Sequence, residues 1–309
     1  MRENSRSIVK KYEAELKDYI RKREALFTVL EPIYYYCAKA VEWTKLFFAD
    51  RGILKYYILY PLGSMYRVIR AKMQSSYLKE LKEIRNMYRG KRCFIVAAGP
   101  SLQIADLDKL STKKEVTFGL NSIYRLYDKT RWRPDFYCCL DLELEKEIEK
   151  NYGKNAFKKL ARKFCFVDSK VKSKKMPNKV RYIHYNRLLH GFGKWDDDFR
   201  YSDNLIWGLY DLYDVTCSTI QIAKWMGFKE VYLLGVDCNY LDKKKYAEGA
   251  RGQVADELKE EEYIYIQGQK EKAFRYLGES IAHNSGFKVY NATRGGRLEI
   301  FPHVDFDKL

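Results

Sequence analysis

The chain has 309 residues, of which 46% are hydrophobic and 16% are aromatic, so it is long and apolar enough to bury a sizeable core. Charged residues make up 32% of the sequence and are of both signs, which excludes disorder as the dominant state. The formal net charge of +17 predicts a polyanionic partner: nucleic acid, an anionic lipid surface or a phosphorylated substrate. Because no recognised nucleic-acid motif accompanies this charge, no nucleic acid is expected.

The cysteines and the first residues indicate a cellular setting. Seven cysteines are present, and no two of them form a C-x-x-C pair. An odd number without that spacing argues against a disulfide framework or a zinc knuckle and favours a reduced, cytoplasmic environment. The sequence has no apolar segment typical of a signal peptide, and no run reaches the roughly 18 uncharged residues of a membrane-spanning helix.

Residues 1–89 are predicted to form a basic, aromatic-rich helical extension. Apolar residues from Ile8 to Ile20 recur at helical spacing, residues 33–60 are rich in Tyr and Phe, and a further helix is expected over 64–89. One interpretation is a peripheral anchor, with aromatic rings at headgroup level and Lys or Arg facing anionic lipid on the inner side of the membrane. The other is a helical hairpin that packs on the following domain or on another subunit of a homo-oligomer.

From residue 90 onward, short apolar runs alternate with helical patterns. Apolar runs that end in turn residues are typical of buried parallel strands. The predicted strands are 92–97, 116–120, 136–140, 163–167, 180–183, 231–236 and 287–291, and helices are predicted over 219–226 and 270–284. This alternation predicts an α/β, Rossmann-like domain over 90–309, with a doubly wound and mostly parallel sheet.

Polar residues follow several of these strands. In an open α/β sheet, ligands bind beyond the carboxyl ends of the strands, so these residues are candidates for a shared site. The turn Ala97-Ala98-Gly99-Pro100-Ser101-Leu102 is the first of them. Its glycine permits close backbone approach, its proline can start a helix, and the helix N-terminus offers free amides to a phosphate. An ordinary strand-to-helix turn has the same residues, and the sequence is neither a Walker loop nor G-x-G-x-x-G.

The other candidates follow later strands. Asp141 and Asp237 could hold Mg²⁺ together with phosphate oxygens if they converge, and each could instead cap a strand end or a helix. The segment Asn291–Arg297 contains polar donors, two glycines and two arginines, and could close over a bound donor. The complete set of expected nucleotide-binding residues is Ala98, Gly99, Pro100, Ser101, Asn121, Ser122, Thr219, Asn291, Thr293, Arg294 and Gly295.

These pieces, in this order, resemble the MptE-like family and, more distantly, bacterial sialyltransferases and flagellin-modifying motility accessory factors. The matching segments lie within residues 90–301, and they are 98–102, 121–122, 133–141, 223–237 and 291–296. The resemblance implies a nucleotide phosphate held at the turn with Gly99, Pro100 and Ser101, and Asn121 bonded to the nucleotide or to the departing phosphate. Asn121, Asp141 and Asp237 are then the expected catalytic residues.

The resemblance implies two chemistries. One is transfer of an acidic sugar from a CMP-sugar, with no cofactor required; the other is transfer of diphosphate from ATP to a hydroxymethylpterin, with Mg²⁺ held by Asp141 and Asp237. In the sialyltransferase relatives a histidine acts as general base, but the equivalent segment here, 266–270, has none. His184 or His190 could substitute, and the aromatic segment 195–213 could form a lid or acceptor site.

Three functions are therefore open at this stage. The favoured one is a glycosyltransferase in surface polysaccharide synthesis, which the N-terminal extension would bring to a glycolipid acceptor. The second is a Mg²⁺-dependent pyrophosphokinase that uses ATP. The third is a non-catalytic nucleotide-binding or scaffold module, which the missing histidine motivates.

Overall fold

The computed structural model describes one part of the chain in detail. The described residues are 75–153, 156–168, 180–183, 185–186, 199, 201–206, 208–210, 212–239, 246–250, 260–282 and 286–309. By their contacts, residues divide into two compact units, Met1–Met73 and Gln74–Leu309, and all described residues belong to the second. Of the extension predicted over 1–89, residues 1–74 lie outside the described residues, and its role as an anchor or hairpin stays a prediction.

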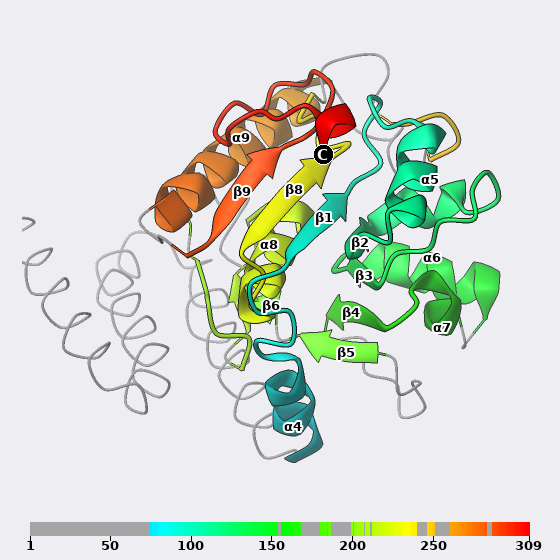
Figure 1. Cartoon of the computed structure of the whole chain (residues 1–309), viewed down its shortest axis with the longest axis vertical. Coiled ribbons are helices and arrows are strands. Elements are labelled where there is room, and N and C mark those ends of the chain that lie inside the picture. Colours follow the sequence, from blue (N-terminus) through cyan, green and yellow to red (C-terminus); the bar gives the residue numbers. More distant parts are fainter. Residues whose placement is uncertain are drawn as a thin grey trace, which may run out of the picture. The chain divides into compact units, whose positions relative to one another are not determined.

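The second unit is built on a parallel sheet (Figure 1). Its seven strands run in the order β5-β4-β3-β2-β1-β8-β9, and each neighbouring pair is parallel. They are β1 (Arg92–Val96), β2 (Thr117–Leu120), β3 (Phe136–Cys139), β4 (Phe164–Asp168), β5 (Val180–Ile183), β8 (Glu230–Leu234) and β9 (Lys288–Asn291). A small parallel pair, β6 (Tyr185–Asn186) and β7 (Leu209–Tyr210), lies apart from this sheet. The predicted α/β, Rossmann-like fold is confirmed.

The order of the strands creates a switch point between β1 and β8. From β1 the chain proceeds outward through β2, β3, β4 and β5, and it then returns to add β8 and β9 on the other side of β1. Connections that leave β1 and β8 thus diverge at the carboxyl edge of the sheet. In doubly wound folds, that divergence opens the crevice in which ligands bind.

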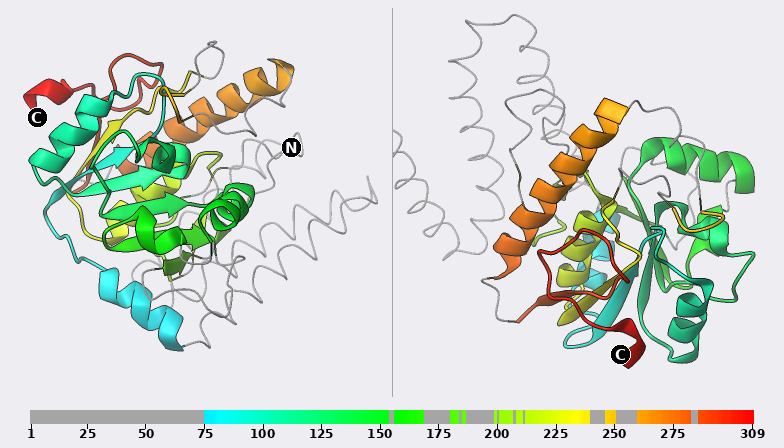
Figure 2. Two further views of the ribbon diagram at one scale, coloured as in Figure 1. Left: turned by 90° about the vertical axis from the view of Figure 1, so that its right-hand side faces the viewer. Right: turned by 90° about the horizontal axis from the view of Figure 1, so that it is seen from above.

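Helices cover both faces of the sheet. Figure 2 shows α8 and α9 over one face, with α5, α6 and α7 over the other. Their bounds are α5 (Ile104–Thr112), α6 (Leu142–Tyr152), α7 (Ala156–Leu160), α8 (Val215–Trp225) and α9 (Glu260–Ala282), with short 3-10 turns η2 (Asn121–Leu126) and η5 (Phe306–Lys308). Because both faces are covered, the central strands bury side chains on both sides, which explains why they read as continuous apolar runs.

Aromatic rings in register brace the strands around the switch point. Phe94 of β1 faces Tyr232 of β8, which in turn faces Tyr290 of β9, with ring centroids 5.2 Å apart in each pair. Phe306 of η5 meets the edge of Phe94 at 5.9 Å. Such pairs add to the stability that comes from burial alone. They therefore fix the segment around η5 against the strands that carry the site.

Residues 75–89 pack with the α/β unit. They form helix α4 (Ser75–Ile84) and the turn after it. The Trp225 indole donates to the carbonyl of Leu81 at 3.0 Å, and the rings of Tyr88 and Phe228 are stacked at 4.8 Å. The sequence placed these residues in the helical extension ending at 89, with packing on the following domain as one of its two interpretations. Residues 75–89 make that kind of contact, against α8 and the turn that follows it.

Two helices begin earlier than the sequence indicated. Helix α8 starts at Val215 rather than 219, because the Asp214 carboxylate accepts a hydrogen bond from the Thr216 amide at 2.8 Å and caps the helix. Helix α9 starts at Glu260 rather than 270. Among the described helices, none combines the length and the apolar character needed to cross a membrane.

Helix α9 contains two glycines, one in open space and one packed against Ile300, that provide a matched test of how the helix packs. A Cβ at Gly268 would meet nothing within 4 Å, whereas a Cβ at Gly278 would lie 2.5 Å from Cγ1 of Ile300. We expect Gly268→Ala to stabilise the fold by about 0.5–1 kcal/mol, since alanine favours the helix. We expect Gly278→Ala to destabilise it by about 1–3 kcal/mol through overpacking. Urea unfolding measures the change in the free energy of unfolding of each variant. Equal changes would contradict the close contact of α9 with Ile300.

Candidate functional site

The turn after β1 lies directly against the loop after β8. The Gly99 amide donates to the carbonyl of Gly235 at 2.9 Å. A Cβ on Gly99 would lie 2.0 Å from Oδ2 of Asp237 and 2.4 Å from that carbonyl, which only glycine avoids. Gly99 therefore allows the backbone to come close to the loop after β8, and this contact explains why a glycine is required here.

Ser101 and Asp237 are hydrogen-bonded to each other. The Ser101 hydroxyl donates to Oδ2 of Asp237 at 2.9 Å, and the Ser101 amide points at the same oxygen at 3.4 Å. Burial raises the pKa of Asp237 above its ordinary value, and the bonds from Ser101 offset part of that rise. Ser101 and Asp237 lie together at the carboxyl edge of the sheet, as the sequence predicted. The serine hydroxyl, however, donates to the Asp237 carboxylate, whereas the sequence predicted that it would contact a phosphate.

A third loop, after β9, completes the arrangement. The Thr293 hydroxyl accepts a hydrogen bond from the Val236 amide at 3.1 Å, and Asn291 bonds the Thr293 amide and the carbonyl of Leu298 at 3.0 and 2.9 Å. Gly296, with φ of +88°, passes so close to Asp237 that a Cβ would lie 2.7 Å from its carbonyl oxygen. In the structure Asn291 and Thr293 shape this loop through these bonds, and their predicted contact with a nucleotide stays a prediction.

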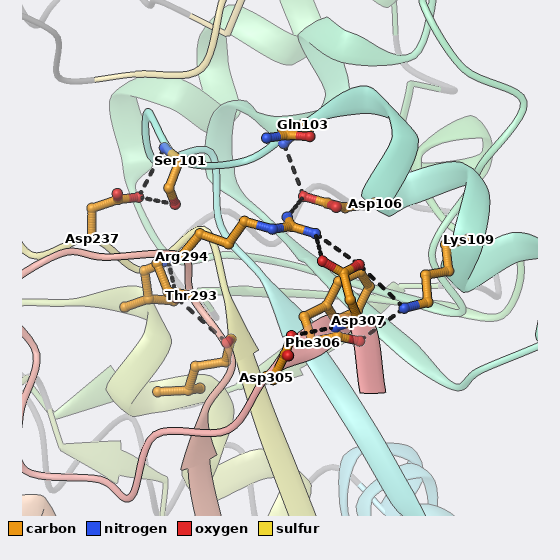
Figure 3. A network of polar contacts seen from close by, with 12 residues as sticks. Ser101, Gln103, Asp106, Lys109, Asp237, Thr293, Arg294, Asp305, Phe306 and Asp307 are labelled. Carbon is orange, nitrogen blue, oxygen red and sulfur yellow. Dashed lines mark hydrogen bonds and ion pairs between the residues drawn. The ribbon is translucent and has the colours of Figure 1, made fainter. Parts of the chain in front are cut away.

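Arg294 projects from this loop to the start of α5 (Figure 3). Its Nη1 contacts Oδ2 of Asp106 at 2.6 Å, and its Nη2 contacts both oxygens of Asp307 at 3.1 and 3.0 Å. Asp106 also accepts the Gln103 amide at 3.0 Å, so one carboxylate joins Arg294 to the first turn of α5. Lys109 reaches Asp307 at 3.4 Å from the same helix.

A cavity opens over the first turn of α5. Its volume is about 480 Å³, and Lys129 and Arg294 supply its positive charge, with Glu248 as a negative neighbour. The Lys129 ammonium donates to the carbonyl of Glu248 at 3.1 Å, which ties the segment 246–250 to the turn after η2. The residues that line the cavity are Pro100, Ser101, Leu102, Gln103, Ile104, Lys129, Ala247, Glu248 and Arg294.

Asn121 follows β2, the strand beside β1. Its φ is +42°, in the left-handed region that asparagine tolerates better than most residues. The Tyr137 hydroxyl donates to its carbonyl, while its side-chain Oδ1 is buried and has no hydrogen-bond partner among the residues that the structure describes. An unsatisfied buried amide oxygen on a constrained backbone is a feature that marks functional sites. Ser122 next to it is buried within η2.

Comparison with known proteins identifies the family of the chain. A family model described as 6-hydroxymethylpterin diphosphokinase MptE-like matches residues 70–243. The chain belongs to the MptE-like family. Membership supports a transferase-type function at the level of the family. Among curated proteins, no sequence matches the chain.

One solved structure resembles this MptE-like chain. It is the structure of the MAf glycosyltransferase from Magnetospirillum magneticum AMB-1, which is 16% identical, with a TM-score of 0.46. The match covers 73% of this chain and 35% of that one, so this chain spans about a third of its length.

The MptE-like match includes Asp141, but the structure keeps it apart from Asp237. Strands β2 and β1 lie between β3 and β8, so the ends of the two strands are separated by three spacings, or about 14 Å. Asp141 is exposed, and its Oδ1 accepts the Leu144 amide at 3.3 Å in the first turn of α6. The predicted metal pair is therefore not brought together, and Asp141 caps a helix instead. Within the described ranges, no group of three or more His, Cys, Asp or Glu side chains is placed to hold a metal ion.

Thr219 also lies away from the site. It is fully buried in α8, where its hydroxyl donates to the carbonyl of Val215 at 2.8 Å and contacts the Cys138 thiol of β3. Desolvation by burial raises the pKa of that thiol to about 12. Thr219 thus belongs to the interface between α8 and the sheet, because the helix begins before it and turns it inward.

The structure describes some of the remaining candidate residues and not others. His184 and His190 lie outside the described residues. Most of the aromatic segment 195–213 is described, and there the ring of Phe199 contacts those of Tyr213 and Tyr276 of α9, with centroids 6.4 and 5.9 Å apart. Its predicted role as a lid or acceptor site stays a prediction.

Segment 266–270, for which the resemblance to sialyltransferases implied a histidine, lies within α9. There Gln267 is buried, and its side-chain amide donates to the carbonyl of Cys238, directly after Asp237. Gly295 is exposed and open, and Ala98 bonds the Ala247 amide through its carbonyl at 2.9 Å.

Sequence reasoning missed the cavity residues that lie outside the strand ends. Lys129 follows a 3-10 turn, and Ala247 and Glu248 belong to a connection without a recognisable motif. Asp106 could have been inferred from the pattern Gln103-x-x-Asp106, because a carboxylate at the third helical position commonly bonds the amide that precedes the helix.

The raised pKa of Asp237 predicts a pH-dependent stability. The folded protein binds this proton more tightly than the unfolded chain, so the contribution is complete below the ordinary value of 3.8 and is lost as pH rises through the folded pKa. In Asp237→Asn this position binds no titrating proton, so the variant lacks this pH-dependent contribution to stability. We expect the free energy of unfolding of the native chain, relative to that of Asp237→Asn, to fall as pH rises from about 4 and then to level. Urea titrations between about pH 4 and 7 measure the difference, and a rise with pH would contradict the assignment.

Proposed function

We propose that this MptE-like chain is a nucleotide-dependent transferase that binds its donor phosphate in the cavity over α5. The observation that carries the proposal is the coincidence of three features at the switch point between β1 and β8. They are a cavity of about 480 Å³, the start of a helix, and two cationic side chains, Lys129 and Arg294. The location agrees with the rule for doubly wound folds.

The first turn of α5 supplies hydrogen-bond donors to this cavity. The amides of a helix's first turn have no acceptor inside the helix, and the aligned peptide dipoles add partial positive charge there. The Gln103 amide is taken by Asp106, whereas those of Ile104 and Ala105 have no acceptor among the described residues. A phosphate at this point would therefore meet amide donors and two cations together.

The donor we favour is a CMP-activated acidic sugar, with transfer to a surface glycan. In such a transfer an acceptor hydroxyl oxygen forms a bond to the anomeric carbon while the bond from that carbon to a phosphate oxygen breaks. CMP leaves with the bonding electrons, and the acceptor's proton passes to solvent. Donors placed where this charge develops accelerate the step. A single phosphate can be bound by Lys129, Arg294 and the first-turn amides without a metal ion, so the separation of Asp141 from Asp237 does not oppose this chemistry.

The family description favours a second candidate, a diphosphokinase that uses ATP. Transfer from a triphosphate generally relies on Mg²⁺ that bridges phosphate oxygens. Asp237 is the carboxylate nearest this chemistry, but it is bonded to Ser101 and is remote from Asp141 in the strand order. Under this candidate the metal would depend on ATP itself for most of its ligands.

The acceptor and the setting follow from the same proposal. A glycolipid acceptor on an anionic membrane surface suits the basic, aromatic sequence that precedes residue 75, which would act as a peripheral anchor on the cytoplasmic side. If those residues pair subunits instead, the protein would be a homo-oligomer that acts on a soluble acceptor.

A nucleotide panel separates the candidates. We expect CMP and CDP to raise the melting temperature of the full chain without metal, because phosphate and cytidine bind together at the switch point. Stabilisation by ATP only in the presence of Mg²⁺ would favour the diphosphokinase. If no nucleotide has any effect, the non-catalytic reading replaces both.

Lys129 tests the location of the phosphate. We expect Lys129→Gln to weaken CMP binding about tenfold, since a charged hydrogen bond to phosphate contributes about 1.5–3 kcal/mol. The matched control is Lys113→Gln, which removes the same charge at the other end of α5. Isothermal titration calorimetry measures both affinities. Equal losses in the two variants would mean that only the overall charge matters and that the cavity is not the site.

A further inference from the structure

The two carboxylate partners of Arg294 differ in their surroundings. Asp106 is 2% exposed and also accepts the Gln103 amide, so it holds Nη1 of the arginine firmly at the first turn of α5. The Asp307 side chain is 64% exposed and contacts the Nη2 edge alone, with Lys109 beside it. An exposed ion pair contributes little net free energy because water and salt screen it.

We propose that Asp307 is a resident counter-ion that competes with the ligand's phosphate for Arg294. The inference rests on the proposed nucleotide site and adds its regulation. In the unliganded protein Asp307 occupies the Nη2 edge of the guanidinium. Arg294 also lines the cavity, so a phosphate bound there draws the guanidinium away from Asp307, while Asp106 keeps the arginine at the first turn of α5.

The exchange needs only a side-chain rotation. Phe306 is 3% exposed, and its carbonyl accepts a hydrogen bond from Lys109 at 2.9 Å. The Asp307 amide is held by Asp305 at 2.9 Å. The backbone of η5 therefore stays anchored when the Asp307 carboxylate turns to solvent.

The charge around Arg294 favours the exchange. With Asp106 and Asp307 in place, the charge of the arginine is more than compensated, and Lys109 restores the balance. Moving the Asp307 carboxylate away leaves net positive charge at the first turn of α5, which a phosphate can neutralise with shorter, charge-assisted bonds. Arg294 becomes a ligand-binding residue, Asp106 a positioning residue, and Asp307 the competitor.

The test measures binding of inorganic pyrophosphate and of CMP to the full chain by calorimetry. We expect Asp307→Asn to tighten binding of both by about twofold to fivefold, the factor that corresponds to the loss of an exposed ion pair. The control is Glu299→Gln, which removes one negative charge from an exposed side chain of the same loop region. It should leave both affinities unchanged.

A second variant removes the arginine. In an Arg294→Gln background, Asp307→Asn should no longer change either affinity, because the competitor has lost its target. A purely structural role of Asp307 would give the same change in both backgrounds. Tightening in the Glu299→Gln control, or persistence of the Asp307→Asn effect without Arg294, would overturn the inference.

The two probes separate this inference from the function on which it rests. If pyrophosphate binding depends on Asp307 but CMP does not bind, the competition is correct and the CMP-dependent function is wrong. If CMP binds and Asp307→Asn has no effect, the function stands and the competition is wrong. If neither probe binds to the native chain or to Asp307→Asn, both are wrong.

Discussion

The contact between the turn after β1 and the loop after β8 is the constraint on which the candidate site depends. The Gly99 amide meets the Gly235 carbonyl at 2.9 Å, and there is no room for a side chain at either Gly99 or Gly296. Backbone therefore lies against backbone from three loops. Asp237 is enclosed where they meet, and burial in this enclosure raises its pKa.

This enclosure changes what the Gly-Pro-Ser turn can do. An empty bend would present the Ser101 amide and hydroxyl to an anionic ligand, but the Asp237 carboxylate already accepts from both. The protein's own anion thus sits at the tip of β1. The cavity lies further along the chain, at the first turn of α5, where Lys129 and Arg294 add the charge that the tip lacks. Asp237 then acts on the shape of the site and keeps the turn rigid.

Much of the fold could be predicted because buried parallel strands read as continuous apolar runs. The meeting of Ser101 with Asp237 could also be predicted, since both follow strands and ligands gather beyond strand ends. The predicted convergence of Asp141 with Asp237 was wrong because the distance between two strand ends depends on strand order, which a single sequence does not give. In the sheet, β3 is three places from β8. Thr219 was expected at the start of its helix, but α8 begins at Val215. This places the threonine one turn further along, on the face that packs against the core.

The excess of positive charge could not locate the site either. Many described cations lie over aromatic rings, as Arg92 does over Phe94, Arg133 over Tyr127 and Lys163 over Tyr88. Such contacts stabilise packing and use the charge locally. What distinguishes Lys129 and Arg294 is their position beside the first turn of a helix, where peptide amides add to their effect.

The carboxylates at this point are as informative as the cations. An arginine left without partners beside a helix N-terminus would repel the positive end of the dipole, which costs stability while the cavity is empty. Asp106 removes that cost permanently from a buried position, and Asp307 removes part of it from an exposed one. The difference in exposure separates a fixed counter-charge from an exchangeable one. The proposed exchange at Arg294 depends on this difference, because Asp106 holds the arginine while Asp307 can leave it.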